Sequence, residues 1–103
     1  MTWCLYVLEC ADGSYYCGIT NDITRRVAQH NTGKGAKYTR SRRPVELKHH
    51  WLGLTHSTAA KSEYWFKRLS RRQKERALLN PNWPSTVLKE RHNADASSPD
   101  LEE

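Results

Sequence analysis

Glu63 is the side chain whose position in this 103-residue sequence most directly suggests chemistry. It falls in a helix predicted to end near Leu69, where a rotation of 100° per residue places it about 40° from Ala59 and within one turn of Phe66. It therefore lies at the border of an apolar face, where a carboxylate needs a cation or hydrogen bonds to compensate for lost hydration. An ordinary i,i+4 ion pair with Lys67 is the competing interpretation, and the geometry favours neither.

Arg26 and His30 form a second pair at helical spacing. They stand at i and i+4 in a segment whose apolar positions, Ile23 and Val27, have the same spacing, so both polar side chains flank one apolar face. A guanidinium matches phosphate oxygens with two parallel donors. The histidine could hold a phosphate, relay a proton or pack as an ordinary core residue, and the spacing leaves these interpretations open.

Three predicted strands and three main helices must position these residues. The segment 3–10 is apolar on both faces, which predicts a buried central strand, and a turn signal at 11–14 predicts a hairpin to a second strand over 15–19. The order β-β-α-β-α-α predicts an α+β fold, a small three-stranded antiparallel sheet flanked by helices. The remaining predictions are a helix from caps at 20–22 to about 31–33, a loop over 33–44, a strand over 45–54, helices over about 55–69 and 70–79, and a short helical segment over 86–91.

The length predicts one domain, and the charge is distributed unevenly along it. We expect the domain over residues 1–83 and a C-terminal extension over 84–103, acidic and disordered from about residue 94. Residues 94–103 hold four acids and no base, which leaves seventeen Lys and Arg against seven Asp and Glu, a net charge of +10, on residues 1–93. A net charge this positive favours a polyanionic partner, most often nucleic acid, over the alternative of a basic surface that only keeps the protein in solution.

Membrane and disulfide chemistry are both disfavoured. No run of about 18 apolar residues exists, which excludes a transmembrane helix and a membrane partner. The N-terminus lacks the basic region of a signal peptide, so we expect a cytoplasmic protein. Cys4, Cys10 and Cys17 are odd in number and fit neither a zinc site nor a disulfide framework. We expect three free, apolar cysteines without a disulfide partner.

Two basic segments are candidates for contact with the polyanion. The loop over 33–44 carries five bases, no acid and one aromatic side chain that could stack on a base. The helices after Glu63 carry a second basic strip, which an ordinary solvated surface explains equally well. Contacts of this kind position a nucleic acid without reading its sequence. The candidate nucleic-acid-binding residues are Lys34, Lys37, Tyr38, Arg40, Arg42, Arg43, Lys67 and Arg71.

Five elements, taken in order, resemble the GIY-YIG nuclease superfamily. Leu5-Tyr6-Val7 stands for its first tripeptide, Tyr16-Cys17-Gly18 stands for its second, and Arg26, His30 and a helical Glu63 follow. The run Gly18-Ile-Thr-Asn-Asp-x-x-x-Arg26-x-x-x-His30-x-x-Gly33-Lys-Gly-Ala and the segment Lys61-Ser-Glu63-Tyr are similar to its compact single-domain YhbQ-like branch. The resemblance covers about residues 3–79.

This resemblance implies a metal-dependent endonuclease that hydrolyses phosphodiester bonds in DNA. It implies that Glu63 holds one divalent cation, Mg²⁺ or another such as Mn²⁺, which polarises the scissile phosphate. It also implies that Tyr6 activates or orients the attacking water and that Arg26 steadies the transition-state charge, with His30 and Tyr16 assisting. A single carboxylate suits Mg²⁺, because that ion keeps several waters and takes phosphate oxygens as ligands.

Two other functions compete with this hypothesis. A nuclease-like fold that binds nucleic acid without cutting is the main alternative, and the presence of all five implied catalytic residues favours the enzyme. A protein-interaction adaptor that uses Trp65 and Trp83 as exposed aromatics has no motif in its support. Branched or damaged DNA, and with it a part in DNA repair, is the expected substrate, and the sequence does not separate DNA from RNA.

A site that contains both Tyr6 and Tyr16 restricts the register of the hairpin. Tyr6 and Tyr16 must lie on the same face of the sheet, and successive side chains on a strand alternate between faces. A two-residue loop would place Tyr16 opposite Glu9 and separate the two hydroxyls. A three-residue loop over 11–13, with Gly13 in the left-handed region, places Tyr16 opposite Leu8, on the face of Tyr6. We predict this second register.

Overall fold

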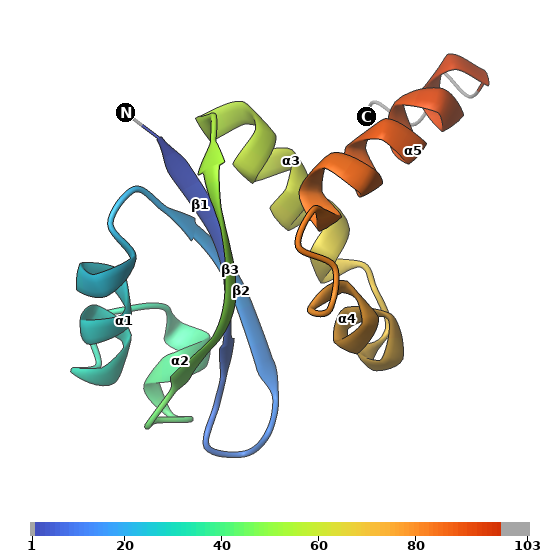
Figure 1. The fold of residues 1–103 in the computed structure, drawn as a ribbon. Helices are drawn as coiled ribbons and strands as arrows, with labels where there is room; N and C mark the ends of the chain where they lie inside the picture. The colour runs from blue at the N-terminus through green and yellow to red at the C-terminus, as the bar shows by residue number, and fades with distance from the viewer. Residues whose placement is uncertain (1, 98–103) are drawn as a thin grey trace.

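A computed structural model describes residues 2–97, with side chains through residue 91. Figure 1 shows a three-stranded sheet, seen nearly edge-on, with helices on both sides. One face is covered by α1 and α2, and the other by α3, α4 and α5. The elements in chain order are β1 Trp3–Glu9, β2 Tyr15–Thr20, α1 Ile23–Asn31, α2 Lys37–Arg40, β3 Glu46–Leu54, α3 His56–Lys67, α4 Arg71–Ala77 and α5 Trp83–Ser97.

The antiparallel sheet has the order β2-β1-β3, which confirms the predicted fold class and the central position of the first strand. The middle of β1 is buried without interruption from Cys4 to Leu8 because helices cover both of its faces. The strand β2 lies at one edge of the sheet. Its position matters for the site, because side chains from either face can reach around an edge strand.

The predicted hairpin register is confirmed. Tyr16 pairs with Leu8 and Gly18 pairs with Tyr6. The amide of Cys10 donates to the carbonyl of Ser14 at 2.8 Å, and Gly13 has φ of 83°, the left-handed region that a three-residue loop requires. Tyr6 and Tyr16 therefore share one face of the sheet, the face that α1 and α2 cover.

Two apolar clusters fill the two sides of the sheet. The larger one joins Leu5, Val7 and Cys17 of the sheet to α3, α4 and α5. The smaller one joins Tyr6, Leu8 and Cys10 to α1. Cys4, Cys10 and Cys17 are buried and free. Within residues 2–97, no helix is long and apolar enough to cross a membrane.

Side-chain caps begin three of the helices, and that of α1 lies within the predicted range 20–22. The Asp22 carboxylate accepts from the amide of Arg25, and the Thr55 hydroxyl accepts from the amide of Thr58. Ser70 and Gln73 form the reciprocal capping box that begins α4. These caps fix where α1 and α3 begin, and they thereby fix the rotation at which each helix presents its side chains to the sheet.

The C-terminal helix is longer than the short segment predicted over 86–91. Pro84 follows the first residue of α5, where its ring costs no helical hydrogen bond. Trp83 is 8% exposed and packs on Trp51 and Phe66, so the adaptor hypothesis, which needs an exposed Trp83, is wrong on that point. The helix continues past residue 94, where the sequence predicts disorder to begin, and the rest of that prediction falls on residues 98–103, outside the described residues.

The segment 33–44, predicted as a loop, contains a single helical turn, α2. Thr39 is fully buried on this turn, while its neighbours Tyr38 and Arg40 are exposed. Burial of one threonine between exposed neighbours holds the turn against α1. The position of α2 brings a part of the basic segment next to the face of the sheet that carries Tyr6.

Candidate active site

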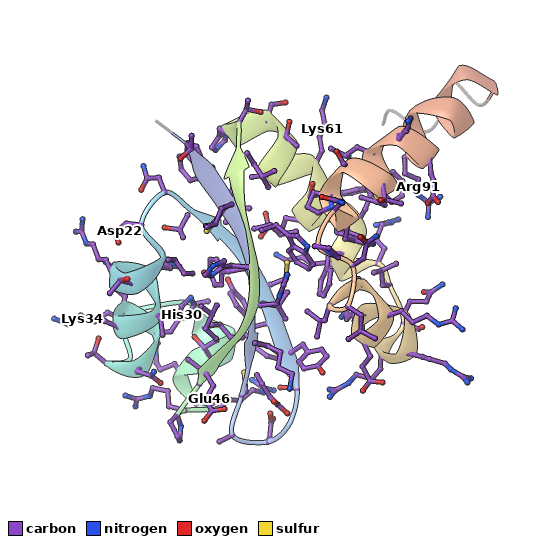
Figure 2. The ribbon with its side chains drawn as sticks, viewed as in Figure 1. Asp22, His30, Lys34, Glu46, Lys61 and Arg91 are labelled. Carbon is purple, nitrogen blue, oxygen red and sulfur yellow. The ribbon has the colours of Figure 1, made fainter. Side chains whose placement is uncertain are left out.

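Tyr6 and His30 meet in the interior, between β1 and α1. The Tyr6 Oη and His30 Nε2 atoms lie 2.9 Å apart, and the two side chains are 1% and 0% exposed. Figure 2 shows His30 between α1 and the sheet, whereas Lys34 points outward. Gly18 makes room for the phenol, because a Cβ at Gly18 would lie 2.5 Å from Tyr6 Oη. The glycine of the second tripeptide is therefore a steric requirement of the tyrosine of the first.

Arg26 joins this pair from the same helix. Its Nε donates to Tyr6 Oη at 3.3 Å, and its Nη1 donates to Gln29 Oε1 at 3.0 Å. The predicted i,i+4 pair of Arg26 and His30 thus converges on one phenolic oxygen. A guanidinium that is half-buried beside a phenol provides a positive charge at the point where an anionic group could approach.

Tyr16 completes the cluster from the edge strand. Its ring centroid lies 5.2 Å from that of His30 and 6.5 Å from that of Tyr6. Tyr38 of α2 stacks on its outer side at 6.0 Å. No side chain that the structure describes makes a hydrogen bond to the Tyr16 hydroxyl. That hydroxyl is available to a ligand.

Burial sets the protonation of the central pair. Burial, together with the positive charge of Arg26, lowers the pKa of His30 to about 4. Burial also raises the pKa of Tyr6 to about 12, although the hydrogen bond and charge of Arg26 act against that rise. At neutral pH the imidazole is therefore neutral and the phenol is protonated. The pair contains one proton between Oη and Nε2 and no net charge.

Glu63 lies on α3, on the other side of the sheet from α1 (Figure 1). Its side chain is 24% exposed, at the border of the buried face as predicted, and it pairs with Lys67 Nζ at 3.0 Å. That ammonium lies 5.9 Å from the centroid of the Tyr16 ring. Burial raises the pKa of the neighbouring Cys17 thiol, and the charge of Glu63 adds to the rise. Glu63 thus approaches the cluster around the edge strand β2, and its link to Tyr16 runs through Lys67.

The structure brings together four of the five predicted catalytic residues on the α1 face, while Glu63 lies on the opposite side of the sheet. Tyr6 contacts His30 and Arg26, and the Tyr16 ring packs near those of Tyr6 and His30. Thr39, which the sequence analysis did not select, also belongs to this cluster: its Oγ1 lies 2.7 Å from His30 Nδ1. No spacing rule identifies a threonine inside an irregular segment, because its contact depends on how that segment folds back.

Glu63 offers a hard divalent cation one carboxylate, which suits an ion that needs few protein ligands. Among the described residues, no group of three or more His, Cys, Asp or Glu side chains could hold a metal ion. A zinc or calcium site of several protein ligands is therefore not built here. Mg²⁺ and Mn²⁺ can take one carboxylate and fill the other positions with water and phosphate oxygens. Lys67 pairs with Oε2 of Glu63, so a cation would bind the other carboxylate oxygen or displace the ammonium.

The basic segment divides into two kinds of side chain. Arg42 pairs with Asp12 at 3.1 Å and donates to the carbonyl of Tyr38 at 2.8 Å. Arg43 donates to the carbonyls of Arg40 and Asn31, so both arginines hold the segment in place. The exposed basic side chains of this segment that have no hydrogen bond or ion pair within the described residues are Lys34, Lys37 and Arg40.

Arg40 also stands between two open clefts. One has a volume of about 540 Å³ and is lined by Asn31, Arg40, Ser41, Arg43 and Pro44. The other has a volume of about 560 Å³ and is lined by Lys37, Tyr38, Arg40, Ser41 and Arg42. Neither cleft contains Tyr6, His30 or Glu63. Both clefts are open and are lined by two or three basic side chains, which can contact the phosphates of a polyanion.

The basic strip of α3 and α4 is partly engaged as well. Lys67 pairs with Glu63, and Arg71 donates to the Gly13 carbonyl at 2.7 Å while it lies 3.7 Å from the centroid of the Tyr15 ring. Arg71 also pairs with Glu75 at 3.1 Å. Arg71 therefore ties α4 to the hairpin loop, which keeps the edge strand close to α3.

Comparison with known proteins identifies the family to which these features correspond. The family model described as GIY-YIG catalytic domain matches residues 2–76. A UPF0213 protein of Bacillus cereus is 57% identical over 72 residues, which cover 70% of this chain and 75% of that protein. A UPF0213 protein of Halobacterium salinarum is 56% identical over 71 residues, which cover 69% of this chain and 92% of that protein.

Two solved structures are similar to this chain. The solution structure of a UPF0213 protein from Bacillus halodurans has 44% sequence identity and a TM-score of 0.51, covering 85% of this chain and 97% of its own. A solution structure from E. faecalis has 46% identity and a TM-score of 0.54, covering 76% and 83%. Residues 2–76, which the family model matches, include all five predicted catalytic residues. The match ends before α5 begins.

The buried imidazole predicts how stability depends on pH. Unfolding returns His30 to an ordinary pKa near 6.5, whereas the folded protein holds it at about 4. Below pH 6.5 the unfolded chain therefore binds a proton that the folded protein does not. The free energy of unfolding should fall by up to about 1.4 kcal/mol per pH unit between pH 6.5 and 4 from this group. Urea denaturation of the wild type and His30→Gln across this range measures the difference, and equal pH slopes for the two proteins would contradict the account.

Proposed function

Because the chain belongs to the GIY-YIG family, we propose that it is a metal-dependent endonuclease that hydrolyses phosphodiester bonds in DNA. The observation that carries this proposal is the convergence of Arg26 and His30 on the buried Tyr6 hydroxyl. A phenol held between a neutral imidazole and a guanidinium is an arrangement for moving a proton next to an anion. It contributes no apolar packing that a phenylalanine would not provide.

The proton path follows from the contact of 2.9 Å between Tyr6 Oη and His30 Nε2. The Tyr6 oxygen takes a proton from the attacking water while its own proton passes to His30 Nε2. The water oxygen bonds to phosphorus, the bond to the leaving oxygen breaks, and the leaving oxygen takes a proton from solvent. The pKa values of about 12 and 4 make this transfer uphill in the free protein. A bound phosphate opposes that cost, because its negative charge offsets the Arg26 charge and favours a protonated imidazole.

Each remaining residue acts on the phosphate or its charge. Arg26 stabilises the negative charge that develops on the phosphate in the transition state. The Tyr16 hydroxyl is free to donate to a phosphate oxygen. Glu63 would hold the divalent cation, which when bound polarises the scissile phosphate and neutralises the leaving oxygen. Lys67, 5.9 Å from the centroid of the Tyr16 ring, would pair with a phosphate of the same nucleic-acid strand.

The substrate class follows from charge and exposure. The basic segment exposes Lys34, Lys37 and Arg40, whose side chains have no partner in the part of the chain that the structure describes. Contacts from such side chains to phosphates bind a nucleic acid irrespective of its sequence. RNA has the same backbone charge, so a cleavage assay should include plasmid DNA, branched DNA and RNA.

One observation favours the alternative of a non-cleaving nucleic-acid-binding module. The Glu63 carboxylate is already paired with Lys67, as a merely structural residue would be. A pair of this kind on a helix surface contributes about 0.3–0.5 kcal/mol. The binding module needs no more of Glu63 than this pair, whereas the enzyme needs a Glu63 carboxylate oxygen for a metal ion.

Glu75 offers a matched control for Glu63. It also pairs with a basic residue at i,i+4, at 3.1 Å, and its side chain is 54% exposed. Glu63→Ala should abolish Mg²⁺-dependent nicking of plasmid DNA, and Glu75→Ala should leave nicking within about twofold of wild type. DNA affinity should persist or rise slightly in Glu63→Ala, because a negative charge leaves the phosphate site. Nicking by a folded Glu63→Ala protein at the wild-type rate would reject the role of Glu63, and a lack of nicking by all three proteins would favour the binding module.

The two kinds of arginine in the basic segment allow a test of binding. Arg40→Gln removes an unpartnered surface cation and should lower DNA affinity, with the slope of log K against log salt reduced by about 0.9 for one lost phosphate contact. Its thermal stability should not change. Arg42→Gln breaks the contacts to Asp12 and Tyr38 and should cost roughly 1 kcal/mol of stability, with little change in the salt slope. Fluorescence titrations at several salt concentrations check both, and a reversed pattern would show that the exposed residue is not the phosphate contact.

A further inference from the structure

Thr39 lies outside the predicted catalytic set and contacts His30 on the side away from Tyr6. It is 0% exposed, on the single turn α2. Its Oγ1 lies 2.7 Å from His30 Nδ1 and 3.0 Å from the carbonyl oxygen of Ala36. The hydroxyl group therefore stands between two polar atoms and can donate its one proton to only one of them.

The direction of these hydrogen bonds follows from the carbonyl. A carbonyl oxygen only accepts, and two oxygens 3.0 Å apart with no proton between them repel each other, so the Thr39 proton points to Ala36. The lone pairs of Oγ1 then face His30, and Nδ1 must carry the imidazole proton. A neutral imidazole has a single N–H group. His30 Nε2 is therefore bare and accepts the hydroxyl proton of Tyr6.

We propose that Thr39 is a positioning residue that fixes His30 in the tautomer protonated at Nδ1, which keeps Nε2 free to receive the proton of Tyr6. The catalytic consequence rests on the proposed function, whereas the tautomer is a property of the folded protein alone. In the opposite tautomer, Nε2–H would donate to the Tyr6 oxygen. The imidazole could then not take the phenol proton along this contact.

The chain reaches this geometry because the basic segment is packed tightly on His30. A Cβ at Gly35 would meet His30 Nδ1 and would lie 2.8 Å from the His30 Cα, so glycine permits the close approach. Four residues later, Thr39 points inward while Lys37 and Arg40 stay exposed on the same turn. The turn α2, which exposes Lys37 and Arg40 to solvent, thus also determines the tautomer of His30.

The test reads the tautomer directly. In ¹⁵N-labelled protein, the coupling of the two ring nitrogens of His30 to its carbon-bound protons shows which nitrogen carries the proton. Wild type should show Nδ1–H at neutral pH, and Thr39→Ser, which keeps the hydroxyl, should show the same. Thr39→Val has a similar shape but no acceptor, and it should convert His30 largely to Nε2–H. Tyr6→Phe removes the other partner and should leave the Nδ1–H tautomer in place.

Cleavage of plasmid DNA by the same proteins gives the second readout. Thr39→Val should cut about 10- to 100-fold more slowly, the range seen when hydrogen-bond partners that orient metal-bound histidines are removed. Thr39→Ser should restore cleavage to within a few-fold of wild type. A purely packing role predicts instead that Thr39→Val resembles wild type in both the spectrum and the rate.

Each outcome decides the proposal. A wild-type spectrum with Nε2–H, or a folded Thr39→Val protein with an unchanged tautomer, would overturn it. If Thr39→Val does not fold, Tyr6→Phe decides: retention of Nδ1–H supports Thr39, and conversion to Nε2–H assigns the tautomer to Tyr6. If wild type shows the expected tautomer but cuts no nucleic acid, the proposed function fails while the role of Thr39 in setting the tautomer stands.

Discussion

The hydrogen bond between Tyr6 Oη and His30 Nε2 crosses the interface between the sheet and α1, and the rest of the site is arranged around it. Both groups are buried, so without this hydrogen bond His30 Nε2 would lose its one partner among the described residues and the Tyr6 hydroxyl would keep only Arg26. The pairing demands a glycine opposite Tyr6, because a side chain at Gly18 would occupy the space of the phenol. It also demands that α1 begin at its Asp22 cap, since a shift of one residue would turn His30 by 100°.

The proposed site depends on the edge strand β2, because its residues come from both faces of the sheet. Tyr16 and Cys17 are adjacent in this strand and point to opposite faces. On one face the Tyr16 ring packs near that of His30, and on the other the negative charge of Glu63 helps to raise the pKa of the Cys17 thiol. A central strand would separate the two groups, whereas an edge strand leaves a short path around it. Lys67 lies on that path, paired with Glu63 and close to the ring of Tyr16.

Local sequence signals predict most of the fold and much of the site. Capping residues, a turn with Gly13 and an apolar strand determine the hairpin and the starts of α1 and α3, because each acts within a few residues. The convergence of Arg26 and His30 follows from helical spacing alone. The contact of Thr39 with His30 could not be predicted, because it depends on the path of the segment 33–44 through space. The burial of Trp83 was missed for the same reason, since nothing near it in sequence shows that α5 packs back on Trp51.

The account requires one divalent cation at Glu63, close enough to the edge strand to act with Tyr16 and Tyr6. Paramagnetic broadening by Mn²⁺ in ¹⁵N and ¹³C spectra, with dimethyl phosphate present as a phosphodiester, tests that requirement without relying on turnover. The account predicts the strongest broadening at Glu63 and Lys67, weaker broadening at Tyr16 and Tyr6, and loss of all of it in Glu63→Gln. Broadening that is centred elsewhere, or that survives in Glu63→Gln, would contradict it.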